Sequence, residues 1–167
     1  MSEMQPLMKK LALSDEEVME YLSKGRDGVL CSNGPDGYPY GVPVNYILRN
    51  GKICFHGRAA GEKYDNILRD GKVCFTVYSH EGFEITGPET CNVTTDYTSV
   101  IVKGRVEEVT DPKEKEDILY DLVKTLVPVK DNGPVNPHKA AAAAVFAITI
   151  ESATGKKRPA MPGNRTI

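Results

Sequence analysis

The residue types best suited to chemistry gather where a strand pattern ends and a helical pattern begins, in Phe55 to Lys63 (FHGRAAGEK). Gly57 and Gly61 leave main-chain N–H groups accessible. Arg58 and Lys63 supply two positive charges, and a helix N-terminus adds roughly half a charge. This combination is typical of a site for a phosphate monoester. The alternative is a solvated turn whose basic side chains only face water.

His56 lies inside the predicted strand that leads into this loop. Imidazole titrates near neutral pH, so His56 is the candidate general acid or base. The alternative is a packed, hydrogen-bonded histidine with no chemical role. No Walker loop, HExxH motif or Ser/His/Asp order occurs elsewhere in the chain.

A second segment of interest is Pro43-Val44-Asn45-Tyr46. Pro43 has no N–H group to donate to a sheet, which predicts an edge or a bulge. The neighbouring main chain could then pair with the edge of a planar ligand, and Asn45 offers both a donor and an acceptor. An ordinary edge strand explains the same residues equally well.

The elements that must position these segments are short strands and a few helices. Asn50-Gly51 predicts a type I′ hairpin, and residues 80–96 read as a loop. Helices are expected to begin at Ser14, after Gly61, at Asp111-Pro112 and over Ala140–Ala144, and strands are expected over 28–32, 38–48, 52–57, 72–79, 97–109 and 145–151. Hairpins and short helices link these strands, so the pattern predicts a small antiparallel β-barrel with α decoration.

Length and composition fit one cytoplasmic domain over 1–167, with an N-terminal arm (1–13) and a C-terminal tail (153–167). The chain has 167 residues, of which 40% are apolar, enough for a single core. The 21 basic and 23 acidic residues give a net charge of −2, which disfavours nucleic acid as the main partner. No apolar run is long enough to span a membrane, and the first 30 residues contain no apolar secretory segment.

The cysteines predict neither a metal site nor a disulfide framework. Four are present, without a CxxC pair. Cys31, Cys54 and Cys74 lie in apolar runs and are expected to be buried in a reducing cytosol, whereas Cys91 lies in a polar loop.

Three blocks of the sequence resemble a known group of proteins. GYPYGVPVNYILRNGKICFHGRAAGEKYDNILRDGKVCFTV (37–77) is similar to the FMN-binding split-barrel proteins of the pyridoxamine 5'-phosphate oxidase-like superfamily, above all to the 5-nitroimidazole-resistance (Nim-like) branch. YTSVIVKGRVEEVTDPKEKEDILYDLV (97–123) and SATGKK (152–157) resemble two further blocks of that branch. The resemblance implies a six-stranded antiparallel split β-barrel and a homodimer with FMN at the interface.

The resemblance also implies roles for individual residues. His56 matches the active-site histidine of the Nim-like pattern and is the expected catalytic residue. The strand from Pro43 would run along the isoalloxazine, and the loop around Lys63 would hold the ribityl phosphate. The expected cofactor-binding residues are Pro43, Val44, Asn45, Tyr46, Phe55, His56, Gly57, Arg58, Gly61, Lys63, Thr98, Ser99, Val100 and Lys156.

One departure from the family pattern bears on the substrate. Pyridox(am)ine-phosphate oxidases carry an RQVRxEG-type strand, whose two arginines would fall at Thr98 and Ile101 of this chain. Neither residue can bind phosphate as arginine does, so oxidation of pyridoxine phosphate is not expected. The first hypothesis is therefore an FMN-dependent reductase of small redox-active molecules, nitroimidazoles among them.

Two alternatives belong to other classes of function. One is a flavin-binding electron carrier or sensor without catalysis, which would share the same FMN loop. The other is a haem-binding split barrel, which would need an axial ligand near the C-terminus; no histidine follows His138.

Overall fold

A computed structural model describes residues 9–129, 133–161 and 165–166 of the chain. The strands are β1 (Asp27–Asn33), β2 (Pro39–Arg49), β3 (Lys52–Arg58), β4 (Lys72–Ile85), β5 (Val93–Glu108), β6 (Ala143–Arg158) and β7 (Arg165–Thr166). The helices are α2 (Asp15–Lys24), α3 (Glu62–Arg69), α4 (Pro112–Leu126) and α5 (Pro137–Ala142). Residues 1–8 of the predicted N-terminal arm lie outside the described residues.

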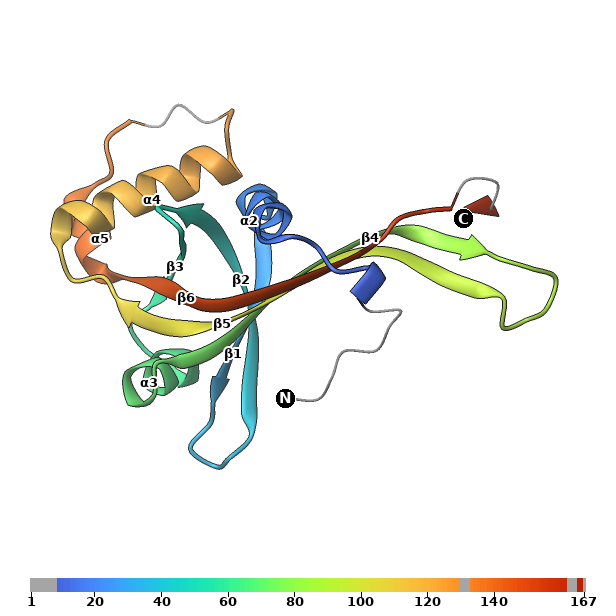
Figure 1. The fold of residues 1–167 in the computed structure, drawn as a ribbon. Coiled ribbons are helices and arrows are strands. Elements are labelled where there is room, and N and C mark those ends of the chain that lie inside the picture. Colours follow the sequence, from blue (N-terminus) through green and yellow to red (C-terminus); the bar gives the residue numbers. More distant parts are fainter. Residues whose placement is uncertain (1–8, 130–132, 162–164, 167) are drawn as a thin grey trace.

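Six of these strands close into one antiparallel ring in the order β1-β2-β3-β6-β5-β4, because β4 pairs with β1 as well as with β5 (Figure 1). The predicted fold class, a mainly β, six-stranded antiparallel split barrel with peripheral helices, is confirmed. Among the described residues, no helix combines the length and apolar character needed to cross a bilayer.

Local sequence chemistry explains several boundaries. Asn50 and Gly51 have φ values of 50° and 73°, the positive values that a type I′ hairpin requires. Ser14 and Glu17 form the predicted capping box: the Glu17 N–H donates to Ser14 Oγ at 3.2 Å, and the Ser14 N–H donates to the Glu17 carboxylate at 2.8 Å. Asp111 caps α4 by accepting the Glu114 N–H at 2.8 Å, as predicted.

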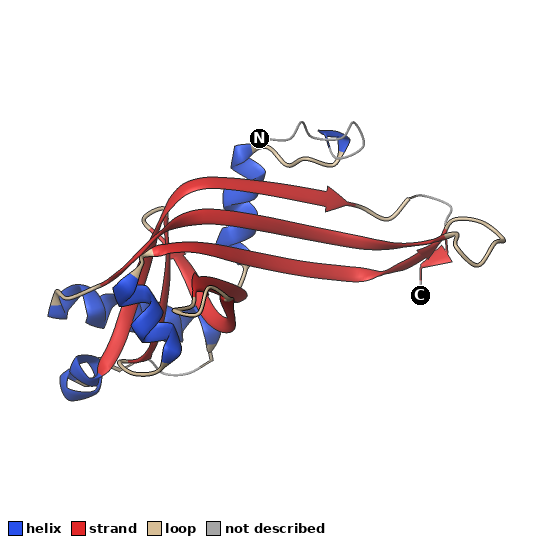
Figure 2. Cartoon of the chain, turned by 90° about the horizontal axis from the view of Figure 1, so that it is seen from below, coloured by secondary structure: helices blue, strands red, loops and turns tan. Residues whose placement is uncertain are grey.

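Three strands are longer than predicted and form an arm that extends beyond the barrel (Figure 2). The predicted loop over 80–96 is wrong, because β4 continues to Ile85 and β5 begins at Val93. A β-bulge between His80 and Gly82 adjusts the register, so the pairing continues. On the neighbouring strand, β6 runs to Arg158, well into the predicted C-terminal tail.

Two helix ends depend on single residues. Gly25 caps the C-terminus of α2 in an extended conformation (φ −67°), whereas glycine at a helix C-terminus is commonly left-handed. A Cβ at Gly25 would lie 2.0 Å from the Tyr46 hydroxyl oxygen, so glycine is required here for close approach. Helix α5 begins at Pro137 and not at Ala140, because Asn136 caps it by accepting the His138 N–H at 3.0 Å.

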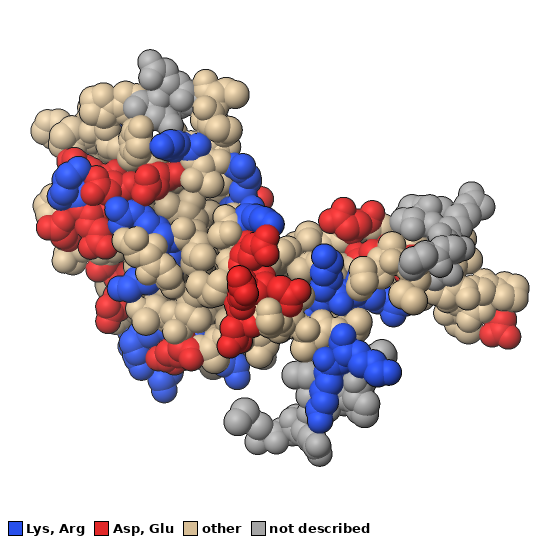
Figure 3. Space-filling model, turned by 45° about the horizontal axis from the view of Figure 1, so that its top comes forward, with Lys and Arg blue, Asp and Glu red and all other residues tan. Residues whose placement is uncertain are grey.

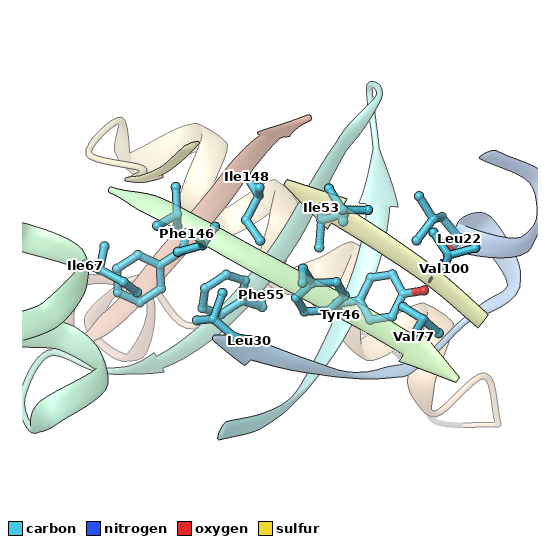
Figure 4. Packing of buried hydrophobic residues seen from close by; sticks show 14 of the residues in the cluster. Leu22, Leu30, Tyr46, Ile53, Phe55, Ile67, Val77, Val100, Phe146 and Ile148 are labelled. Carbon is cyan, nitrogen blue, oxygen red and sulfur yellow. Dashed lines mark hydrogen bonds between the residues drawn. The ribbon is translucent and has the colours of Figure 1, made fainter. Parts of the chain in front are cut away.

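The main core fills the inside of the ring (Figure 4). Tyr46 meets Phe75 edge-on with ring centroids 5.1 Å apart, and Phe55 stacks on Phe146 at the same separation. Each pair is worth about 0.5–1.5 kcal/mol beyond its burial. Leu22 of α2 closes one end of the barrel, where its carbonyl accepts the Tyr46 hydroxyl at 2.9 Å.

A smaller core lies outside the ring, where α4 packs on β2, β3 and β6. It contains Cys54, which is buried as predicted, together with Ile47, Val109, Ile118, Leu122 and Val145. The prediction of burial is wrong for Cys31 and Cys74, which are only partly buried. Their strand positions alternate with the core positions Leu30 and Phe75, so they face outward.

Candidate functional site

The ring has an opening, here called the split, between β2 and β3. These strands pair over Tyr46–Arg49 and Lys52–Phe55 and then diverge. Beyond that point Pro39–Asn45 pairs with β1 alone among the described strands, and His56–Arg58 pairs with β6 alone. The two segments that the sequence singled out therefore border the same opening.

The free edge of β2 offers main-chain groups to a ligand. The Tyr46 N–H donates to the Arg26 carbonyl at 2.9 Å, on the β1 side. Because successive residues of a strand point their main-chain groups to opposite sides, those of Pro43 and Asn45 face the split. Pro43 has no N–H, so residues 43–45 present two carbonyls and the Asn45 N–H to the split, and the predicted edge strand at Pro43 is confirmed. The Asn45 side-chain amide donates to the Asp27 carboxylate.

The loop on the other border of the split carries two basic side chains that form no ion pair among the described residues. Lys63 Nζ lies 2.5 Å from where a Cβ on Gly57 would stand, and 5.8 Å from the centroid of the Phe55 ring. Burial lowers the pKa of Lys63. Neither Lys63 nor Arg58 forms an ion pair with any described residue. A partly buried cation without a partner is costly, so this position favours an anionic ligand.

The start of α3 adds donors to the same loop. Gly61 precedes the helix with φ 93°, and no side chain caps the first turn. The main-chain N–H groups of that turn are therefore available to an anion. Glu62 and Asp65 lie in this turn and offset part of the helix dipole. Anion binding here thus depends mainly on Lys63, Arg58 and the main chain.

His56 stands at the junction between this loop and an apolar pocket. It pairs with Val145 of β6 and faces outward. Although the residue is exposed, the protein atoms packed around the imidazole lower its pKa, and the charge of Lys63 lowers it further. The ring is therefore mostly neutral at pH 7 and can both donate and accept a hydrogen bond.

The pocket beside His56 has a volume of about 690 Å³, within the range of small-molecule sites. Apolar side chains of α4 and the segment leading into α5 form most of its wall: Leu119, Tyr120, Leu122, Val123, Leu126, Val127, Pro134, Val135, Ala140 and Ala143. No residue of this wall was expected at a functional site. The signal was present in the sequence, since Leu119 and Val123 add a second apolar row beside Ile118 and Leu122.

Comparison with known proteins decides the family. A family model described as pyridoxamine 5'-phosphate oxidase matches residues 14–157. The chain belongs to this family. A comparison with curated proteins finds no match.

Several solved structures resemble the chain over most of its length. They include the flavocytochrome Anf3 from Azotobacter vinelandii, with 23% identity, 95% of this chain and 73% of that chain covered, and a TM-score of 0.81. A candidate 5-nitroimidazole antibiotic resistance protein from Bacteroides thetaiotaomicron has 22% identity, coverage of 87% and 86%, and a TM-score of 0.74. An FAD-binding protein from Mesorhizobium loti has 24% identity, coverage of 88% and 96%, and a TM-score of 0.66. At these identities the likeness shows the shared fold.

Several residues expected at the cofactor have side chains that face the protein interior. Tyr46, Phe55 and Val100 are fully buried in the core, and Val44 packs against it. The side chains of these four residues therefore do not face a ligand in the split. Thr98 lies beneath α2, where its carbonyl accepts the Tyr21 hydroxyl at 3.2 Å.

Ser99 and Lys156 lie away from the split. They are cross-strand partners on β5 and β6. Two strands, β1 and β4, separate Ser99 from Asn45 around the ring, which corresponds to three strand spacings or about 14 Å. One chain therefore brings together the residues of β2, β3 and α3, and leaves Ser99 and Lys156 outside that group.

Proposed function

We propose that the protein binds FMN in the split and uses it to reduce small redox-active molecules. FMN combines one phosphate monoester with a planar heterocycle whose edge carries both donors and acceptors. The observation that supports the proposal most is the position of the Lys63 ammonium, which lies beside Gly57 on one border of the split and has no ion-pair partner among the described residues. The free main-chain edge of β2 forms the other border. Membership of the pyridoxamine 5'-phosphate oxidase family supports the proposal, as do structural neighbours named for FAD binding.

The residues of the split have separate tasks in this proposal. Lys63, Arg58 and the main chain from Gly57 to Gly61 hold the phosphate through charge-assisted hydrogen bonds. The Asn45 N–H and the carbonyls of the β2 edge hold the rim of the ring system. When bound, FMN supplies the electron chemistry. His56, neutral near pH 7, exchanges a proton with a molecule in the adjoining pocket.

Nitroaromatic compounds, nitroimidazoles among them, are the first substrates to test. The apolar wall of the pocket suits a flat, uncharged ring, and one structural neighbour is named for 5-nitroimidazole resistance. Oxidation of pyridoxine phosphate is not part of the proposal. Thr98 and Ile101 stand where the arginines for that substrate would be, and Thr98 lies beneath α2.

The proposal includes a homodimer with FMN at its interface. Ser99 and Lys156 lie too far from the split to serve the site of their own chain, so a second copy would have to bring them there. The outward face of the arm also exposes large apolar side chains, with Tyr78 55%, Phe83 46% and Ile101 46% exposed. A second copy would cover these residues. The four cysteines are free, in keeping with a cytoplasmic location.

The absorption spectrum of the purified protein, before and after incubation with FMN and desalting, tests the proposal. Retained bands near ~375 and ~450 nm, with one FMN per chain, are expected of a flavoprotein. Turnover of a nitroaromatic with NADH or NADPH under anaerobic conditions would then support the reductase. Stoichiometric binding without turnover would favour a non-catalytic flavin carrier, and a protein that ignores FMN would refute both.

A further inference from the structure

Cys31 and Cys74 form a cross-strand pair on the outer face of the barrel. They lie directly opposite each other in the antiparallel pairing of β1 with β4, and both thiols are free. Directly opposite residues of such a pair have Cα atoms about 4.5 or 5.5 Å apart, depending on their position in the ladder. Both distances fall within the range of roughly 4.4–6.8 Å that a disulfide spans. The main chain therefore already holds these two cysteines at bonding distance.

The surroundings of the pair leave it accessible to a small molecule. Both cysteines line a pocket of about 480 Å³ on the outside of the ring. On the β2 side, Cys31 is opposite Gly41, where even an added Cβ would stay 3.6 Å from the sulfur. On the β5 side, Cys74 is opposite Lys103, and Lys72 also lines the pocket. Lys72, Lys103 and Glu151 thus line the same pocket as the two partly exposed thiols.

We propose that Cys31 and Cys74 form a reversible intrachain disulfide when the protein meets a peroxide. The thiolate of one cysteine attacks a peroxide oxygen, the O–O bond breaks, and the departing oxygen takes up a proton. The second thiol then attacks the resulting sulfenic sulfur, the S–O bond breaks, and water leaves. For hydrogen peroxide, two thiols lose two electrons and two protons, and the peroxide becomes two waters. A thiol reductant reverses the reaction.

The environment favours Cys74 as the first nucleophile. Burial raises the pKa of the Cys31 thiol, and the neighbouring Cys74 raises it further, which disfavours Cys31 as the attacking thiolate. Cys74 has the Lys103 ammonium on the adjacent strand. Cys31 then acts as the resolving thiol. This site lies outside the split and does not rest on the proposed FMN function.

The Cys31–Cys74 disulfide would link β1 to β4, the two strands whose pairing closes the ring. β1 and β4 are joined by four register pairs, Val29–Ser32 with Val73–Thr76, and Cys31 with Cys74 is one of them. A covalent link there constrains the unfolded chain and holds the ring closed. The oxidised protein is therefore expected to have a higher thermal midpoint than the reduced protein.

Peptide mapping of the full-length protein tests the proposal. Protein treated with hydrogen peroxide is alkylated and digested with trypsin and Glu-C together, because the tryptic peptide 73–103 contains both Cys74 and Cys91. Cleavage at Glu81, Glu84 or Glu89 separates them. The expected product links the Cys31 and Cys74 peptides, lowers the intact mass by about 2 Da, and disappears on reduction.

Variants assign the link and provide the controls. C54S and C91S should keep the link and the rise in thermal midpoint on oxidation, whereas C31S and C74S should lose both. Stepwise oxygen addition to single cysteines without a link would overturn the proposal, as would disulfides only between chains or a pairing with Cys91. The map of the unsubstituted protein decides the question even if a variant fails to fold.

Discussion

The Lys63 ammonium lies where a side chain at Gly57 would stand. A Cβ on Gly57 would come within 2.5 Å of Lys63 Nζ and 3.2 Å of its Cε. Because Gly57 of β3 has no side chain, the space beside it is open to the Lys63 ammonium of α3. That ammonium is the end of a flexible side chain, so it can be displaced without unfolding the barrel.

Gly57→Ala is therefore expected to weaken FMN binding while preserving the fold. The added methyl group displaces the Lys63 ammonium from its position beside residue 57, and we expect a loss of roughly tenfold in FMN affinity, about 1.4 kcal/mol. Fluorescence titration measures the affinity, and circular dichroism checks the fold. In the Lys63→Ala background the same change should cost little more, because the two residues act through one charge. If the losses of affinity in the two single variants were additive, Gly57 would not act through the position of Lys63.

Lys63→Ala is expected to weaken FMN binding by roughly tenfold to a hundredfold, because a charge-assisted hydrogen bond to phosphate is worth about 1.5–3 kcal/mol. Lys52→Ala is the matched control, since Lys52 is exposed at the start of β3, at the opposite end of that strand from Gly57. Riboflavin, which has no phosphate, should bind the variant and the parent equally. Equal FMN affinity in the variant and the parent would exclude Lys63 from the phosphate site.

His56 is expected to titrate below 6.5 in the folded protein, because its surroundings and Lys63 both disfavour the imidazolium. Proton NMR of the imidazole measures this, and Lys63→Ala should raise the pKa of His56. With its pKa lowered, the folded protein binds fewer protons near pH 6 than the unfolded chain. The stability that His56 contributes is thus complete above pH 6.5 and declines as the pH falls through the folded-state value. His56→Gln should flatten that part of the pH profile, and an unchanged profile would contradict the assignment.

Gly25→Ala is expected to destabilise the fold by about 1–3 kcal/mol, because the new methyl group would overlap the Tyr46 hydroxyl at 2.0 Å. Tyr46→Phe alone should cost about 1 kcal/mol, since it removes the hydrogen bond to the Leu22 carbonyl. Denaturant unfolding measures both. The double variant should be more stable than the sum of the single losses predicts, because the clashing oxygen is absent. Strict additivity would show that the two groups do not meet.

Ile101→Lys is expected to weaken the proposed homodimer. The side chain is 46% exposed on the outward face of β5, so a lysine there is tolerated in one chain and unfavourable in an apolar interface. Light scattering after size-exclusion chromatography measures the mass. Lys103→Glu, on the same face of β5, tests whether any charge change has this effect. A monomeric parent protein would refute the dimer directly.

The parts of the fold predicted correctly depend on neighbours in sequence. Three such features are the Asn50-Gly51 turn, the Ser14 cap and the Gly57–Lys63 loop. Each depends on interactions within a few residues, so the sequence alone predicts it. The closure of β1 on β4 is different, because residues about 43 positions apart meet there. Cys31 and Cys74, which are partly buried, were predicted to be buried because an outward strand position and an inward one look alike within an apolar run.

In the candidate site, too, the local features could be predicted from the sequence and the contacts between distant segments could not. The loop around Lys63 and the edge at Pro43 could be identified separately, but their meeting across the split depends on where β2 and β3 part. The need for glycine at position 25 could not be predicted from neighbouring residues, since it comes from Tyr46 on a distant strand. The placement of Ser99 and Lys156 away from the split could not be read from any local pattern.

The unpaired edge of β2 also bears on how the protein avoids aggregation. Open strand edges invite another chain to add a strand, and a barrel with a gap in its wall exposes two of them. Pro39 and Pro43 lie on that edge strand and lack the N–H groups that strand addition needs. The same prolines that leave the opening free for a ligand would therefore make it a poor template for self-association when the ligand is scarce.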